Sequence, residues 1–305
     1  MILEVKMLQA LGVCLLVTMA GSAVAEAASA EDGAASPTQV DHLNIVFSVS
    51  DAAAVHEFYG EILGLQRIPD IQFPDDQYMI RYLGGASELK FIVTGQDLPR
   101  MAGGAGNARG IRLLALLLPL SEQAGILERL ADAGRVVPNV TVRENDAGEF
   151  RYAFAMVYDG DDNQVELVFL AQSTPEEVFQ QAQIGLSVSN HAPMDDFLSN
   201  VLHYIPIVTE GRIHRYDMGS SQLKFWEVSA DLPAWNARPT DKIGMNLIQA
   251  IVPDVAAVRS AVLARGGTIH TEPFALGTLA TIMFVEGPDG ILFEFAGPLL
   301  ERLQQ

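Results

Sequence analysis

The sequence predicts an α+β fold built from four similar units, each a strand, a helix and several further strands. Internal repeats carry this prediction. Residues 81–100 and 215–234 agree at ten of twenty positions in register, where chance gives about one match. Two further pairs of segments share a pattern of strand and helix, namely 42–68 with 181–207 and 110–137 with 244–269. The chain is therefore a duplication of a two-unit half.

The units begin near residues 42, 110, 183 and 244. In the first and third units an alternating strand is followed by an Asp or Asn helix cap and about ten helical residues. In the second and fourth units the helix is expected to end at a glycine, Gly134 or Gly266, as helices often do. Each half closes with an acidic, Gly-containing turn that leads into a strand carrying Glu166 or Glu294.

The N-terminus is typical of a secretory signal peptide. Lys6 precedes an apolar run from Met7 to Met19, and Ala-Val-Ala stands before Glu26. The alternative is an uncleaved anchor, and translation could start at Met7 instead of Met1. We divide the chain into a signal peptide 1–25, a flexible lead-in 26–39, a first two-unit domain 40–171, a linker 172–182, a second two-unit domain 183–298 and a C-terminal tail 299–305.

The charge and composition limit the partners. A net charge of −19 and a pI near 4.5 oppose binding to nucleic acid or to anionic membranes. The only cysteine, Cys14, lies in the predicted signal peptide, so thiol chemistry is not expected in the mature chain. We expect an exported protein, periplasmic or secreted, that has no membrane contact after cleavage, is a monomer or homodimer, and takes a small-molecule ligand or substrate.

The repeated segments resemble the vicinal oxygen chelate superfamily, which contains glyoxalase I, bleomycin-resistance proteins and extradiol dioxygenases. The residues that carry the resemblance are DHLNIVFSVSDAAAVHEFYGEILGL (41–65), SELKF (87–91) and GDDNQVELVF (160–169). The resemblance implies four βαβββ modules in two cup-shaped mixed sheets, with units one and two sharing the first cup. It also implies a divalent metal in a cup, held by side chains from the first and last strands of two modules.

For the first cup, strand alternation directs Glu88, Lys90 and Glu166 inward. The resemblance then implies a metal site of His42, Glu88 and Glu166, which suits one Mn, Fe, Co, Ni, Zn or Mg ion. Either His42 reaches the cup through a bulge or Asn44 takes its place. The fourth position falls among three apolar residues, Leu113, Leu114 and Ala115.

For the second cup, the corresponding residues are Gln183 (or Gln181), Gln222, Leu247 and Glu294, and no metal is expected there. Lys90 and Lys224 are two of only four lysines and occupy the same place in the repeat. We expect Lys224 to compensate the charge of Glu294, as a substitute for a cation. Lys90 could pair with Glu166 or bind a ligand. The alternative is a lysine whose charge reaches solvent at the rim. Trp226 would line the pocket or pack in the core.

Two functions follow from this sequence. The first is an exported protein that binds a small molecule in a cup with a partial metal site. The second is a metal-dependent lyase or isomerase of the glyoxalase type, with Glu166 and Lys90 as catalytic residues. A second histidine ligand is missing, which weighs against extradiol dioxygenase chemistry. No nucleophile elbow is present.

Overall fold

A computed structural model of the chain describes residues 36–73, 77–100, 104–144, 148–171, 181–207, 212–235, 241–278 and 280–300. The predicted signal peptide lies outside these residues, as do most of the lead-in, the linker and the tail. Within the described part of the chain, no helix is long and apolar enough to cross a membrane.

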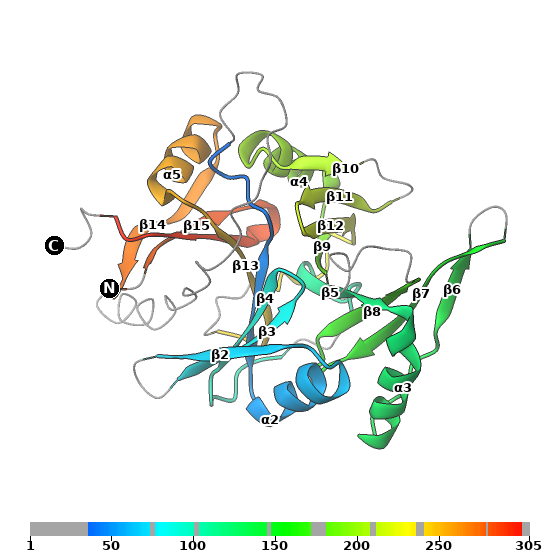
Figure 1. Cartoon of the computed structure of the whole chain (residues 1–305). Helices are drawn as coiled ribbons and strands as arrows, with labels where there is room; N and C mark the ends of the chain where they lie inside the picture. Colours follow the sequence, from blue (N-terminus) through cyan, green and yellow to red (C-terminus); the bar gives the residue numbers. More distant parts are fainter. Residues whose placement is uncertain are drawn as a thin grey trace, which may run out of the picture.

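The four predicted units are present, and the α+β prediction is confirmed (Figure 1). Unit one comprises β1 (Asn44–Val49), α2 (Ala52–Val55), η1 (His56–Ile62), β2 (Arg67–Gln72), β3 (Tyr78–Gly84) and β4 (Ser87–Val93). Unit two comprises β5 (Gly110–Pro119), η3 (Leu120–Glu122), α3 (Gln123–Asp132), β6 (Thr141–Glu144), β7 (Phe150–Tyr158) and β8 (Gln164–Leu170).

Units three and four repeat this order. Unit three comprises β9 (Ala182–Val188), α4 (His191–Asp196), η5 (Phe197–Val201), β10 (Ile205–Ile207), β11 (His214–Met218) and β12 (Ser221–Glu227). Unit four comprises β13 (Gly244–Ile251), α5 (Val255–Ala264), β14 (Thr268–Leu276), β15 (Ala280–Glu286), η6 (Pro288–Gly290) and β16 (Leu292–Gly297).

The helix signals in the sequence act as expected. Asp51 and Asn190 cap the helices of units one and three, because each carboxyl or amide oxygen accepts a hydrogen bond from the backbone N–H two residues on, at 2.8 and 2.9 Å. In both units the helix continues as a π-helix. Gly134 and Gly266 follow the helices of units two and four in the left-handed region, with φ of 67° and 79°, where a side chain would be strained.

The strands form two eight-stranded sheets, and the units do not pair in chain order. Sheet I joins units one and four, in the order β14-β15-β16-β13-β1-β4-β3-β2. Sheet II joins units two and three, in the order β10-β11-β12-β9-β5-β8-β7-β6. The expectation that units one and two share a cup is therefore wrong. The first strands pair across the halves, β1 with β13 and β5 with β9, both antiparallel.

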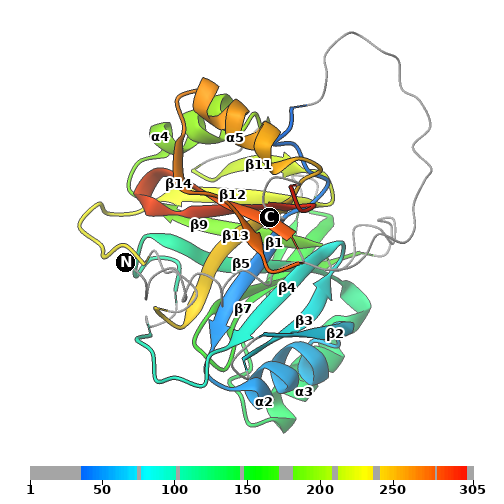
Figure 2. The same ribbon diagram turned by 90° about the vertical axis from the view of Figure 1, so that its left-hand side faces the viewer.

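Units of the same half meet through their helices instead. The helices of units one and two lie together at one end of the molecule, and those of units three and four lie at the other (Figures 1 and 2). Arg129 on α3 donates to the carbonyl of Ile62 at 2.7 Å, and Arg265 after α5 donates to that of Val201 at 3.1 Å. Each half is therefore joined internally through its helices, and the two halves are joined to each other through the strand pairs β1–β13 and β5–β9.

The main core lies on the helix-covered faces of both sheets. Phe47 of β1 and Phe91 of β4 stack with ring centroids 4.7 Å apart, and Tyr59 of η1 packs on Phe91 at 4.5 Å. The odd-numbered residues of β1 and β4 therefore face the helices. The even-numbered residues face the opposite side, which we call the inner face of each sheet.

Candidate functional site

A row of four polar side chains crosses the inner face of sheet I over its central strands. The row consists of Glu88 on β4, Asn44 on β1, Gln249 on β13 and Glu294 on β16. Asn44 is registered opposite Gln249, and Gln249 opposite Glu294. At the other end, the backbone N–H of Glu88 donates to Asn44 Oδ1 at 2.7 Å. We call these four residues row I.

Lys90 lies within this row and is bonded to it. Its Nζ donates to Gln249 Oε1 at 2.6 Å and lies 3.4 Å from Glu88 Oε2. Gln249 joins the two ends of the row, because its Oε1 also accepts from Asn44 Nδ2 at 3.1 Å and its Nε2 donates to Glu294 Oε1 at 2.8 Å. Arg81 on β3 forms an ion pair with Glu88 at 3.1 Å. Lys90 is 1% exposed and Glu294 0% exposed, so these charges are held away from water.

Glu294 is the least compensated group in row I. Burial raises the pKa of its carboxyl from 4.5 to about 7, against the hydrogen bond from Gln249 and the positive charge of Lys90. Its Oε1 accepts from Gln249, whereas its Oε2 is buried and has no hydrogen-bond partner among the described residues. A buried polar atom without a partner is unusual in folded proteins and calls for an explanation.

The rest of the inner face of sheet I is apolar. A second hydrophobic cluster, separate from the main core, contains Val46, Phe73, Met79, Ile92, Leu247, Leu276, Ala280, Ile282, Phe284 and Ala296. These residues come from all eight strands of the sheet or from positions directly next to them, and no helix contributes one. Row I and this cluster together make a buried apolar layer with a polar centre, which we call cup I.

Sheet II carries the equivalent row in a simpler form. Gln222 on β12, Gln183 on β9, Ala115 on β5 and Glu166 on β8 are in register across its central strands. Gln183 Nε2 donates to Gln222 Oε1 at 3.2 Å. Lys224, the counterpart of Lys90, forms an ion pair with Glu166 at 2.5 Å. We call this row II; it holds one carboxylate and one ammonium.

The pairing of the units corrects two predicted contacts. Glu88 is in sheet I and Glu166 in sheet II, so the structure does not bring together the predicted metal set of His42, Glu88 and Glu166. For the same reason Lys224 compensates Glu166 rather than Glu294. The idea that a lysine faces a terminal-strand glutamate agrees with this geometry, but the glutamate belongs to the other half of the chain.

Gln249 was not predicted as a member of row I, and the structure decides between His42 and Asn44 at the first-strand position of unit one. The sequence pattern predicts Leu247 at the first-strand position of unit four, whereas the antiparallel register with β1 brings Gln249 there and puts Leu247 in the apolar cluster. The side-chain alternation of β13 was visible in the sequence, but its register was not. Asn44, and not His42, occupies row I.

His42 and Trp226 lie beside the two rows. His42 precedes β1, and burial lowers the pKa of its imidazole while the nearby carboxylates of Asp41 and Glu88 oppose this effect. Trp226, on the inner face of sheet II, covers Gly185 so closely that a Cβ at residue 185 would meet its ring at 3.0 Å. Trp226 therefore forms part of the inner face of sheet II, beside row II.

The fold family implies a divalent metal at the positions of row I, but the residues present do not fit one. The ammonium of Lys90 contacts Gln249 Oε1 and approaches Glu88 Oε2, two of the oxygens that a metal would need as ligands. Nowhere in the described residues do three or more His, Cys, Asp or Glu side chains gather in a metal-binding group. A second cation beside Lys90 would be repelled at this distance.

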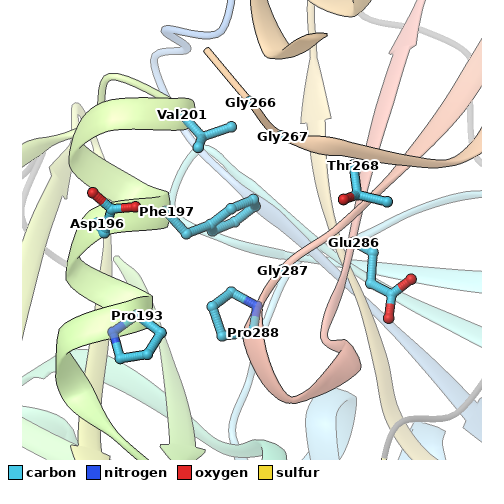
Figure 3. Close-up of a pocket in the computed structure, with 10 residues that line it drawn as sticks. All are labelled: Pro193, Asp196, Phe197, Val201, Gly266, Gly267, Thr268, Glu286, Gly287 and Pro288. Atoms are coloured by element: carbon cyan, nitrogen blue, oxygen red, sulfur yellow. The ribbon is translucent and has the colours of Figure 1, made fainter.

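Two cavities lie outside the inner faces. One of about 430 Å³ is formed by η5 and α4 against the turn after α5 and the turn after β15 (Figure 3). Its two carboxylates, Asp196 and Glu286, stand on opposite sides of Phe197 and do not converge. The other, of about 340 Å³, is lined by His191, Arg212, His214 and Glu227. Row I has the more enclosed polar groups, and we take cup I as the candidate site.

Comparison with solved structures identifies the class of fold. The chain has the fold of the vicinal oxygen chelate superfamily, as its sequence pattern indicated. It is similar to glyoxalase I from Zea mays, with a TM-score of 0.63 and 16% identity over 84% of this chain and 92% of that one. It is similar to a putative dioxygenase from Bacillus subtilis, with a TM-score of 0.59 and 16% identity over 86% of each chain. No protein-family model and no curated protein matches the sequence.

Proposed function

We propose that the protein binds a small, largely apolar molecule in cup I and does so without a divalent metal ion. The observation that carries the proposal is the composition of the inner face of sheet I, an apolar cluster made by the sheet alone around a buried polar row. Ligand pockets commonly combine an apolar lining with a few placed polar groups.

Lys90 supports the metal-free form of this function. Its ammonium bonds to Gln249 and lies near Glu88, so the charge of row I is balanced by a side chain instead of an ion. The competing function is a metal-dependent lyase or isomerase of the glyoxalase type. Its support is that row I supplies two carboxylates and two amides, and metal analysis separates the two functions.

The first experiment measures metal. The purified mature protein is incubated with Mn²⁺, Zn²⁺ or Ni²⁺, desalted, and analysed by inductively coupled plasma mass spectrometry. We expect far less than one equivalent of each. One equivalent that is lost on Glu294→Gln would refute the metal-free proposal and support the enzyme.

The second experiment measures binding. The neutral fluorescent probe N-phenyl-1-naphthylamine is titrated into the wild type and into two variants that fill one cup each. Ala296→Phe fills cup I two residues beyond Glu294, and Val168→Phe occupies the corresponding place beyond Glu166 in sheet II. We expect saturable binding that Ala296→Phe weakens about tenfold or more and Val168→Phe leaves unchanged. Equal effects of the two variants would contradict binding in cup I.

We also propose that the protein is exported. This part of the proposal rests on the sequence of the N-terminal segment, which lies outside the described residues. Expression of the full chain in a Gram-negative host, followed by osmotic-shock fractionation and N-terminal sequencing, tests it. We expect a periplasmic product that begins at Glu26. Retention of an intact Met1 or Met7 start in the membrane fraction would favour the uncleaved anchor.

A further inference from the structure

The unpartnered oxygen of Glu294 bears on which ligand cup I takes. Glu294 Oε1 accepts from Gln249 Nε2 at 2.8 Å, which fixes the orientation of the carboxyl group. Oε2 is then left without a hydrogen-bond partner in the described protein, with the whole residue buried. An unmade hydrogen bond at a buried polar atom costs stability. A ligand that supplied the missing partner of Oε2 would therefore bind more tightly by the free energy of that hydrogen bond.

The surroundings of this oxygen are apolar. On β15, Phe284 is registered opposite Glu294, and Ile282 opposite Ala296, which is two residues along β16. Phe284, Ile282 and Ala296 all belong to the apolar cluster of cup I. A ligand that reaches Oε2 would therefore bury an apolar body against the cluster and place one polar group at Glu294.

The charges of row I restrict that polar group. A cationic amine can only donate, so it would serve Oε2 only while the carboxyl is ionised, and a ligand carboxylate, which can only accept, would lie next to the carboxyls of Glu88 and Glu294. A hydroxyl group is neutral and can both donate and accept a hydrogen bond. It is thus a suitable partner for Oε2 whether or not the carboxyl carries a proton.

We infer that Glu294 Oε2 anchors the hydroxyl group of the ligand, and that the ligand class of cup I is an apolar alcohol or phenol. This inference rests on the proposed function, since it requires that cup I binds a small apolar molecule. It adds a specificity-determining residue and a chemical class to that function.

The experiment compares two probes of the same size and shape, 2-naphthol and 2-methylnaphthalene, which differ by a hydroxyl in place of a methyl group. Their dissociation constants are measured by competition with N-phenyl-1-naphthylamine. For the wild type we expect 2-naphthol to bind about tenfold or more tightly, as a hydrogen bond to an otherwise unpaired buried group implies. Glu294→Met should bring the ratio close to one.

Two controls keep the result interpretable. Glu166→Met makes the same change in sheet II and should leave the ratio as in the wild type, while Glu294→Gln keeps a polar group and should retain part of the preference. Equal affinities in the wild type, or a preference that survives Glu294→Met with both probes still bound, overturn the inference and leave the proposed function standing. Failure of both probes to bind the wild type overturns the proposed function itself.

Discussion

The raised pKa of Glu294 makes a prediction about how stability depends on pH, and the substitution Glu294→Gln tests it. Burial raises this pKa from 4.5 to about 7. The folded protein therefore binds a proton more tightly than the unfolded chain at this position. The resulting stabilisation is fully present below pH 4.5 and is lost as the pH rises through 7. Gln resembles the protonated carboxyl in shape and does not titrate, so the variant lacks this contribution.

The magnitude follows from the shift of about 2.5 pH units. At about 1.4 kcal/mol per unit, the full effect is about 3 kcal/mol, and between pH 5 and pH 8 it is about 2 to 3 kcal/mol. Relative to Glu294→Gln, the wild type should lose this amount in its free energy of unfolding over that interval. For a chain of this size the difference corresponds to a melting temperature change on the order of 5 °C.

The assay is urea denaturation followed by circular dichroism at pH 5, 6, 7 and 8, with the wild type and Glu294→Gln measured side by side. Glu128→Gln, which removes an exposed glutamate on α3, controls for the loss of one surface carboxylate. Parallel pH profiles for the wild type and Glu294→Gln would refute the reasoning. They would mean that Glu294 is not held in the low-dielectric surroundings that the structure describes.

Three further results are expected. Lys224→Met should lower the free energy of unfolding by about 1 to 3 kcal/mol, because it leaves the half-buried Glu166 without its ion-pair partner. Adding Glu166→Gln should recover most of the loss in the same urea titration, and no recovery would argue against the pair. Gly219→Ala should lower the free energy of unfolding by more than about 2 kcal/mol, since φ is +68° and the new Cβ would lie 2.3 Å from a backbone oxygen. Gly277→Ala, where φ is +52° and the space is open, should lower it by about 1 kcal/mol. Similar melting temperatures for the two variants would contradict the close contact at Gly219. Lys90→Met should allow row I to bind about one Mn²⁺ or Zn²⁺ per chain, measured by mass spectrometry. Lys224→Met should not bind metal, because row II has a single carboxylate. Absence of metal in Lys90→Met would show that other groups besides this lysine exclude cations from row I.

Much of the local structure could be predicted from the sequence because its causes are local. The caps at Asp51 and Asn190, the glycine ends of two helices and the alternation that turns Glu88 and Lys90 inward all depend on neighbouring residues. The repeat of 81–100 in 215–234 predicts that each sheet carries one inward lysine. The structure agrees, with Lys90 in sheet I and Lys224 in sheet II.

The membership of each cup could not be predicted in the same way. Pairing of unit one with unit four depends on contacts between β1 and β13, which are about two hundred residues apart in the sequence, and on their antiparallel register. That register makes Gln249 the hub of row I. The sequence by itself determined the four units, the inward direction of their polar residues and the matched lysines, because alternation and capping are set by adjacent residues. Only the tertiary structure decided that Lys224 meets Glu166 and that Lys90 meets Gln249, since residues more than fifty positions apart become neighbours through long-range strand pairing alone.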